Sequence, residues 1–157
     1  MKVVLTYGSF DIFHIGHLNF LKKAKSYGDY LIVGVTTEAF NLQKGKVCLF
    51  KYKERARIVE SIKFVDEVFA ANSWEEKFQD IVKYKPYIIV ASEEYREKYE
   101  PLKKLCPVKF LPRTPGVSSS KILQLLKSID ELCSILNSLP LNDREAILKL
   151  IREGLKK

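Results

Sequence analysis

The chain has 157 residues, 46% of them hydrophobic and 29% charged, and these values fit one globular domain with a sizeable core. No apolar run approaches the roughly 20 residues of a membrane span, and no charged-then-apolar leader precedes the first predicted strand, so membrane-spanning and secreted classes are disfavoured. The 3 cysteines form no C-x-x-C pair, which disfavours a disulfide scaffold and a cysteine-bound zinc. We therefore expect a cytoplasmic protein.

Positive charge is concentrated in the first part of the chain. The formal net charge is +8, and residues 129–157 contribute none of it, because their 5 acidic and 5 basic residues cancel. A basic body favours an anionic partner, such as a nucleic acid, a lipid surface or a phosphorylated small molecule. An ordinary solvated surface is the alternative that charge alone leaves open.

Short apolar runs alternate with amphipathic segments over residues 1–128. The predicted strands are Val3–Tyr7, Tyr30–Thr36, Val65–Phe69, Tyr87–Ala91 and Val108–Leu111. The predicted helices are His17–Ser26, Lys53–Lys63, Trp74–Lys83, part of Glu94–Leu105, and Ser118–Leu126. This alternation predicts an α/β domain, a Rossmann-like parallel five-stranded sheet with helices on both faces. Ligands bind such sheets at the carboxyl ends of the strands, so the loops there form the candidate site.

Residues 129–157 follow that domain and predict a C-terminal helical extension. A first short helix is expected near Asp130–Ser138. Asn142, with Glu145 three residues later, predicts the N-cap and capping pair of a second helix. The apolar residues of that helix repeat every four positions, at Ile147, Ile151 and Leu155. We expect this tail to pack on the body or on a dimer partner, because it lacks the cationic excess that membrane-surface helices use.

Two histidines mark the loop after the first predicted strand. His14 and His17 are the 2 histidines of the chain, and residues 7–17 read Y-G-S-F-D-I-F-H-I-G-H. Their spacing can bring both imidazoles near a helix start, where N–H groups and the positive end of the helix dipole favour phosphate. Gly8 and Gly16 permit close approach of the backbone. Two surface histidines and a metal pair are the alternatives, and a metal would need a third ligand that no obvious cluster supplies.

Two further clusters carry donors for an anion. Residues 113–121 read R-T-P-G-V-S-S-S-K and offer a guanidinium fork, backbone N–H groups and hydroxyls to a polyphosphate. An ordinary serine cap after a turn is the alternative there. Lys44 and Lys46 flank Gly45 in the loop after the second strand, where a solvated loop is the alternative. Neither G-x-x-x-x-G-K-[ST] nor G-x-G-x-x-G occurs, which disfavours P-loop enzymes and dehydrogenase-type dinucleotide folds.

The first loop and the segment before the last helix of the domain together resemble the cytidylyltransferase family of nucleotidyltransferases. A strand-G-S-F-D-x-F-H-x-G-H-helix motif is joined to R-T-P-G-V-S-S-S-helix at the far end of one βαβ domain. Supporting stretches are Gly28–Val33, Phe40–Lys44, Val65–Val68 and Leu111–Thr114. The resemblance covers about residues 1–127 and is closest to the bacterial members that act on glycerol 3-phosphate.

The resemblance implies a reaction and a set of site residues. The reaction is transfer of CMP from CTP to sn-glycerol 3-phosphate, giving CDP-glycerol and pyrophosphate, by in-line attack on the α-phosphorus. The implied catalytic residues are His14, His17, Lys44 and Arg113. The implied nucleotide contacts are Ser9, Phe10, Gly16, Lys46, Glu94, Thr114, Val117, Ser118, Ser119 and Ser120, and the implied acceptor contacts are Asp11, Lys44, Arg55 and Lys63. The resemblance also implies Mg²⁺ as counterion of the nucleotide, rather than a protein-held metal, and a homodimer.

Two places depart from the pattern of the resembled family. After the fourth strand its glycerol-specific members carry Gly-Asp-Asp-Trp, whereas residues 92–95 here are Ser-Glu-Glu-Tyr. That loop lies near the base in the family, so we expect CTP to be preferred over ATP less cleanly here. Lys63 stands where the family often has an arginine, and a lysine cannot grip a phosphate in the same bidentate way.

Other functions compete with this interpretation. The nearest is the same chemistry on ribitol, choline or ethanolamine phosphate, or with ATP as the donor. A different class is a nucleotide-binding module without turnover that acts through its tail, and the intact histidine pair disfavours it. Nucleic-acid binding is disfavoured because the sequence holds no aromatic-rich strand motif or known reading helix.

Overall fold

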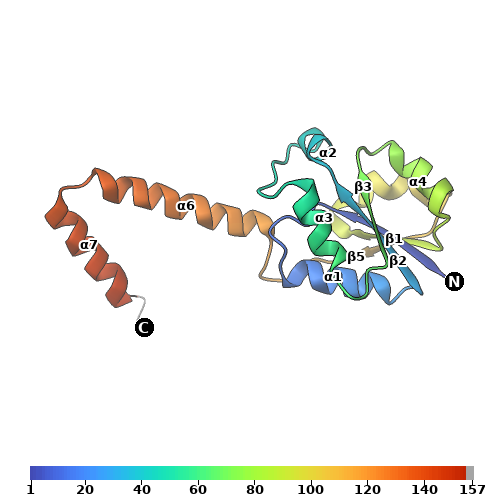
Figure 1. Cartoon of the computed structure of the whole chain (residues 1–157), viewed down its shortest axis with the longest axis horizontal. Helices are drawn as coiled ribbons and strands as arrows, with labels where there is room; N and C mark the ends of the chain where they lie inside the picture. The colour runs from blue at the N-terminus through green and yellow to red at the C-terminus, as the bar shows by residue number, and fades with distance from the viewer. Residues whose placement is uncertain (155–157) are drawn as a thin grey trace. The chain divides into compact units, whose positions relative to one another are not determined.

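The computed structural model describes residues 1–154, and a parallel sheet forms the centre of the first part of the chain (Figure 1). Its strands are β1 (Val3–Gly8), β2 (Tyr30–Thr36), β3 (Glu67–Ala71), β4 (Ile88–Ser92) and β5 (Val108–Leu111). They are hydrogen-bonded in the order β3-β2-β1-β4-β5, and every pairing is parallel. The predicted α/β, Rossmann-like sheet is therefore confirmed.

Helices and short turns connect these strands, and two further helices follow the last strand. The helices are α1 (Ile15–Lys25), α2 (Glu38–Gln43), α3 (Tyr52–Glu60), α4 (Glu76–Tyr84), α5 (Arg96–Tyr99), α6 (Ser119–Ser138) and α7 (Leu141–Gly154). Two 3₁₀ turns, η1 (Glu93–Tyr95) and η2 (Glu100–Lys104), flank α5. The prediction of partial helix over residues 94–105 is thereby confirmed.

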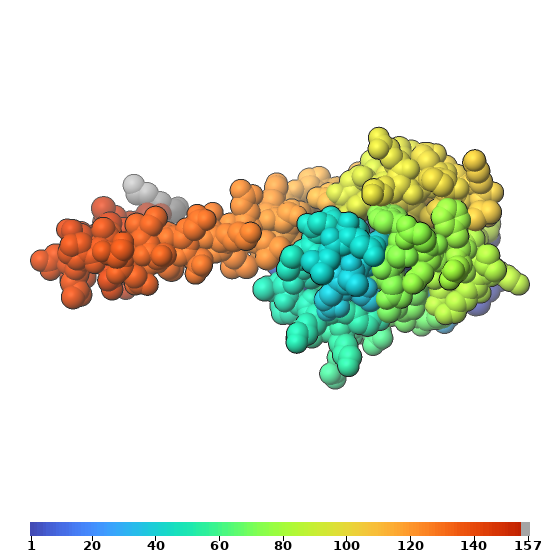
Figure 2. Space-filling view, turned by 90° about the horizontal axis from the view of Figure 1, so that it is seen from above, coloured from blue at the N-terminus to red at the C-terminus, as the bar shows by residue number. Residues whose placement is uncertain are grey.

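Both faces of the sheet are covered, which explains why its strands are nearly continuous apolar runs. Consecutive residues of a strand point to opposite faces. Val4 accordingly joins one buried cluster with residues of α1 and α3, whereas Leu5 joins a second cluster with residues of α2, α4 and α5. Figure 2 shows the outer side of the second group, where the surfaces of α2 (cyan), α4 (green) and residues 93–105 (yellow) adjoin one another.

The structure differs from the predicted elements at α2, β3, α6 and α7. Helix α2 was not predicted, and strand β3 begins at Glu67 rather than Val65. One continuous helix, α6, replaces the two predicted helices of residues 118–126 and 130–138. Asn142 lies inside α7, which begins at Leu141, so its prediction as an N-cap is wrong.

The chain divides into two compact units, residues 1–119 and residues 120–157. In the second unit Arg144 of α7 donates to the backbone carbonyls of Leu136, Asn137 and Leu139, the last at 3.4 Å. Leu136 and Asn137 lie in the last turn of α6 and Leu139 follows it, so the guanidinium caps the end of that helix. Leu155 of the predicted apolar repeat lies outside the described residues, and the packing of the tail stays a prediction. No helix within residues 1–154 is long and apolar enough to cross a membrane.

Candidate active site

The candidate site lies at the carboxyl ends of β1 and β4. The strand order reverses between these two neighbours, because β2 and β3 follow on one side of β1 and β4 and β5 on the other. The loop that leaves β1 holds Phe10 and Ile12 at φ +51° and +47°, in the left-handed region. A non-glycine residue in this region lowers the stability of the fold by about 1–3 kcal/mol, and such residues cluster at functional sites. Phe10 is buried, and its ring centroid lies 5.5 Å from that of His17. In this structure Phe10 therefore packs against the histidine ring.

His14 is the N-cap of α1, and its tautomer follows from a hydrogen bond to the backbone. Its Nδ1 accepts from the N–H of Gly16 at 3.0 Å, so the proton of the neutral ring is on Nε2. A Cβ at position 16 would stand 2.8 Å from the His14 ring, so glycine is required for this approach. The capped N–H is no longer free for an anion, so the ring N–H is the donor that His14 presents.

His17 stacks on His14, with ring centroids 3.9 Å apart and planes 19° from parallel. Burial, and then the neighbouring His14, lower the pKa of His17 to about 4. Burial and the charge of Arg113 also lower the pKa of His14. Both rings are therefore neutral near pH 7 in the free protein, and each can donate one N–H to a phosphate oxygen. The predicted convergence of the two imidazoles is confirmed.

Asp11 anchors two loops to the site. Its carboxylate accepts from the backbone N–H groups of Leu49 and Phe50 at 2.7 and 3.0 Å. Its own carbonyl accepts from the hydroxyl of Ser119 at 2.6 Å, at the start of α6. Asp11 is buried, so the structure gives it a positioning part, and its predicted contact with the acceptor stays a prediction.

Arg55 is fully buried beneath the same loops. Its Nη1 donates to the carbonyl of Ser9 at 2.6 Å and its Nε to that of Phe50 at 2.9 Å. Its Nη2 is buried and has no hydrogen-bond partner within the described residues. An acceptor role for Arg55, which stays a prediction, would rest on this remaining donor.

Asn41 positions the two lysines of the second loop, and the sequence motifs assigned it no role beyond its place in the stretch Phe40–Lys44. Its backbone carbonyl accepts from the N–H groups of Lys44 and Lys46 at 3.0 and 2.8 Å. Its side-chain oxygen accepts from the hydroxyl of Ser9 at 2.9 Å, so Asn41 ties the lysine loop to the histidine loop. The signal available in the sequence was Thr37, which caps α2 and fixes the helix that carries Asn41.

Lys44 is half-buried, whereas Lys46 is exposed. Burial and the charge of Lys46 lower the pKa of Lys44 to about 8. The Nζ of Lys44 stands 4.7 Å from the centre of the Phe40 ring. The Nζ of Lys46 donates to the hydroxyl of Tyr95 in η1 at 2.8 Å. These lysines therefore come from one loop but contact different residues, Phe40 of α2 and Tyr95 of η1.

The pKa of Lys44 predicts a pH limit on use of an anionic acceptor. Lys44 is charged below about pH 8 and loses its proton as the pH rises through that value. We expect kcat/KM for the acceptor to reach half of its neutral-pH value at about pH 8 and to fall further above it, because this ratio reports groups of the free enzyme. Arginine stays charged throughout, so Lys44→Arg should remove the decline, whereas Lys46→Arg should keep it. A decline that survives Lys44→Arg would assign it to another group.

The segment before α6 supplies the remaining predicted residues. Arg113 forms an ion pair with Glu94, so the third predicted cluster meets the loop after β4. Val117 packs close to Gly16, because a Cβ added at Gly16 would stand 3.2 Å from a methyl carbon of Val117. Gly116 takes φ +83°. Thr114 and Ser118 belong to the same connection, and Ser120 is the second residue of α6. The nucleotide contacts predicted for these residues stay predictions.

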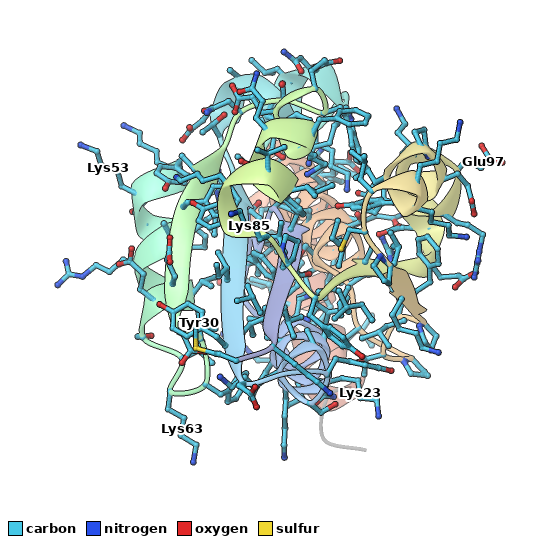
Figure 3. The ribbon with its side chains drawn as sticks, turned by 90° about the vertical axis from the view of Figure 1, so that its right-hand side faces the viewer. Lys23, Tyr30, Lys53, Lys63, Lys85 and Glu97 are labelled. Atoms are coloured by element: carbon cyan, nitrogen blue, oxygen red, sulfur yellow. The ribbon has the colours of Figure 1, made fainter. Side chains whose placement is uncertain are left out.

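Lys63 does not reach the site within one chain. It lies between α3 and β3, four residues before Glu67, and so at the amino end of that strand. Figure 3 shows it at the same end of the molecule as Tyr30, the first residue of β2. The other predicted residues follow the carboxyl ends of the strands. The structure therefore separates Lys63 from the predicted acceptor contacts Lys44 and Arg55 of the same chain.

Comparison with known proteins places the chain beside nucleotidyl-transferring enzymes. Residues 5–125, which include both histidines and the segment before α6, match the family model described as cytidylyltransferase-like. Glycerol-3-phosphate cytidylyltransferase of Bacillus subtilis is 45% identical over 122 residues, covering 78% of this chain and 95% of that protein. The enzyme of the same name from Staphylococcus aureus is 38% identical, covering 83% of this chain and 98% of its own. The crystal structure of a lipopolysaccharide core biosynthesis protein from Thermoplasma volcanium superposes with a TM-score of 0.61 at 27% identity, covering 73% of this chain and 97% of that one.

Proposed function

This chain belongs to the cytidylyltransferase-like family, and we propose that it transfers CMP from CTP to sn-glycerol 3-phosphate, giving CDP-glycerol and pyrophosphate. The observation that carries the proposal is the stacked pair of neutral histidines, held at the start of α1 with one N–H fixed on Nε2 of His14. Such preorganised donors stabilise charge that develops in a transition state.

The chemistry needs no covalent enzyme intermediate. An oxygen of the acceptor phosphate forms a bond to the α-phosphorus of CTP, while the bond from that phosphorus to the β-phosphate bridging oxygen breaks and pyrophosphate leaves. Catalysis then rests on positioning and on stabilising charge. In our proposal His14 and His17 donate to the α-phosphate, Lys44 neutralises the acceptor phosphate, and Arg113 holds the leaving phosphates.

We propose that Mg²⁺ enters as the counterion of CTP. Within the described residues no group of three His, Cys, Asp or Glu side chains is placed to hold a metal. The carboxylate of Asp11 is already engaged by two backbone N–H groups. Phosphate oxygens of the nucleotide are the hard ligands that Mg²⁺ prefers, and the ion would add positive charge beside the leaving group.

The predicted homodimer and cytoplasmic setting remain part of the proposal. The family resemblance supports the dimer, and use of CTP supports a compartment that holds nucleoside triphosphates. In a homodimer Lys63 can approach the candidate site of the other chain, because the fold of its own chain holds it away from the site there. Light scattering of the purified full chain would test the dimer.

A substrate panel tests the reaction itself. We expect pyrophosphate release with CTP and glycerol 3-phosphate, and much slower release when ATP, UTP or GTP replaces CTP. Ribitol, choline and ethanolamine phosphates should be poor acceptors. A clear preference for ATP would overturn cytidylyl transfer, and a clear preference for another acceptor would overturn the glycerol assignment alone.

Glu94 is the proposed reader of the cytosine amine, because a carboxylate accepts from that group. We expect Glu94→Gln to lower the preference for CTP over UTP by about tenfold, since a carboxamide can donate to the uracil carbonyl. Comparing kcat/KM for the two nucleotides measures this. Glu93→Gln is the matched control, because Glu93 lies in the same turn and pairs with Arg96 instead. An unchanged ratio in Glu94→Gln would leave base reading to other groups.

A further inference from the structure

The turn η1 binds two cations that are predicted contacts of the nucleotide. The carboxylate of Glu94 forms an ion pair with the guanidinium of Arg113, which comes from the segment before α6. The hydroxyl of Tyr95 accepts a hydrogen bond of 2.8 Å from the Nζ of Lys46, which comes from the loop after α2. Two neighbouring side chains of one turn therefore occupy cations from two different loops.

The turn itself is held by contacts on the side of the core. The ring of Tyr95 lies 6.0 Å from that of Trp74, and both rings pack against the second buried cluster. Glu93 pairs with Arg96, whose guanidinium lies 4.3 Å from the centre of the Phe110 ring in β5. These contacts fix η1 independently of Lys46 and Arg113.

The loops that carry the two cations have more room than the turn. Gly45 precedes Lys46 at φ +68°, and Gly116 follows Arg113 by three residues at φ +83°. A Cβ added at either glycine would meet no atom within 4 Å, so both backbones border open space. Lys46 is exposed and Arg113 is about half exposed, so each side chain can leave its partner without opening the core.

The ion pair also acts on the charge balance of the site. Burial and the charge of Arg113 lower the pKa of His14, so the guanidinium influences the histidine pair from its place beside Glu94. Burial and then Lys46 lower the pKa of Lys44, and the charge of Glu94 opposes them. An anion that enters the site must therefore compete with Glu94 for its cations.

We propose that η1 is a latch, which holds Lys46 and Arg113 in the free protein and releases them to an entering polyphosphate. This rests on the proposed function and adds a competition within the protein to the binding of CTP and pyrophosphate. Molecules in which the latch is closed do not bind the anion through these cations, so their population lowers its apparent affinity. When the phosphates draw Arg113 away, the carboxylate of Glu94 becomes free to accept from the cytosine amine. Phosphate binding thereby prepares the reading of the base.

Calorimetric titration of the full chain with inorganic pyrophosphate tests the latch without a nucleotide or an acceptor. Glu94→Gln removes the charge that pairs with Arg113, and we expect Kd for pyrophosphate to fall at least about threefold, as for loss of a partly exposed ion pair. Glu93→Gln is the matched control, because it removes an equal charge from the same turn but one that pairs with Arg96. Its Kd should stay within about 1.5-fold of that of the unaltered protein. If Glu94→Gln lowers Kd no more than Glu93→Gln does, the latch does not hold Arg113.

Tyr95→Phe tests the second cation without any change of charge. The variant keeps the ring beside Trp74 but removes the hydroxyl that accepts from Lys46, and we expect Kd for pyrophosphate to fall at least about twofold. Tyr84→Phe is the matched control, because its hydroxyl accepts from Lys83 at 3.0 Å at the end of α4 that leads into the amino end of β4. Equal Kd values in the two variants would remove Lys46 from the latch. If Tyr95→Phe and Glu94→Gln both match their controls, the proposal is overturned as a whole.

The substrate panel separates failure of this inference from failure of the proposed function. If CMP transfer to glycerol 3-phosphate occurs and both variants match their controls, the latch is wrong and the proposed function stands. If no CMP is transferred but both variants bind pyrophosphate more tightly than their controls, the proposed function is wrong and the latch stands.

Discussion

His14→Ala and His17→Ala are each expected to lower kcat by about 10²-fold or more while leaving the fold intact. In the proposed mechanism each histidine supplies one N–H to charge on the α-phosphate, and loss of one preorganised donor at a reacting centre typically costs about 2.7–4 kcal/mol. The two rings stack at 3.9 Å, so the double variant should lose less than the product of the two single losses. Steady-state kcat with saturating CTP and glycerol 3-phosphate measures these effects.

The control for these variants comes from the same helix. Asn19 is an exposed residue of α1, and Asn19→Ala should keep kcat within about twofold. Far-UV circular dichroism should be the same for the unaltered protein, the histidine variants and Asn19→Ala, because neither histidine lies in either hydrophobic core cluster. Near-normal kcat in both single histidine variants would remove the pair from the catalytic site.

Arg113→Lys is expected to raise KM for CTP about tenfold and to leave KM for glycerol 3-phosphate within about twofold. A guanidinium donates two parallel N–H bonds to a phosphate, and an ammonium cannot reproduce that fork. Arg113 is about half exposed and pairs with Glu94, so it can turn from this partner to a nucleotide without unfolding the loop. Titrating each substrate at saturating levels of the other separates the two KM values.

Arg96→Lys is the matched comparison for Arg113→Lys. Arg96 is also an exposed arginine, and it pairs with Glu93 beside the same loop. It has no proposed contact with the nucleotide, so both KM values should stay within about twofold. If Arg113→Lys behaves like Arg96→Lys, the leaving phosphates are held by another group.

The central strands were predictable because they are buried on both faces and so need apolar runs, and Tyr30–Thr36 was delimited correctly. The edge strand Val108–Leu111 was also delimited correctly, although its Lys109 is exposed. The six residues of α2 were missed because a segment of that length shows no helical periodicity. The break predicted within α6 followed polar residues such as Ser128, which an exposed helix tolerates without ending.

The histidine pair was also predictable, whereas the role of Asn41 and the burial of Lys77 were not. Two histidines three residues apart beside a glycine are a local pattern that a sequence displays directly. Lys77 stands in a helix whose apolar spacing predicts a solvated lysine at that position. Its burial depends on rings contributed by β1, α2 and α5, which only the assembled fold brings together.

The anchoring of Asp11 has a consequence for the order in which the molecule folds. The bond from Ser119 to Asp11 joins residues 108 positions apart, and those from Leu49 and Phe50 join residues 38 and 39 positions apart. Closing such long loops costs entropy that nearby contacts do not, so they form late. During synthesis both histidines leave the ribosome early, yet the loop that carries them gains its last anchor only when residue 119 arrives. We therefore expect the candidate site to be completed at the end of folding, after β5 has joined the sheet.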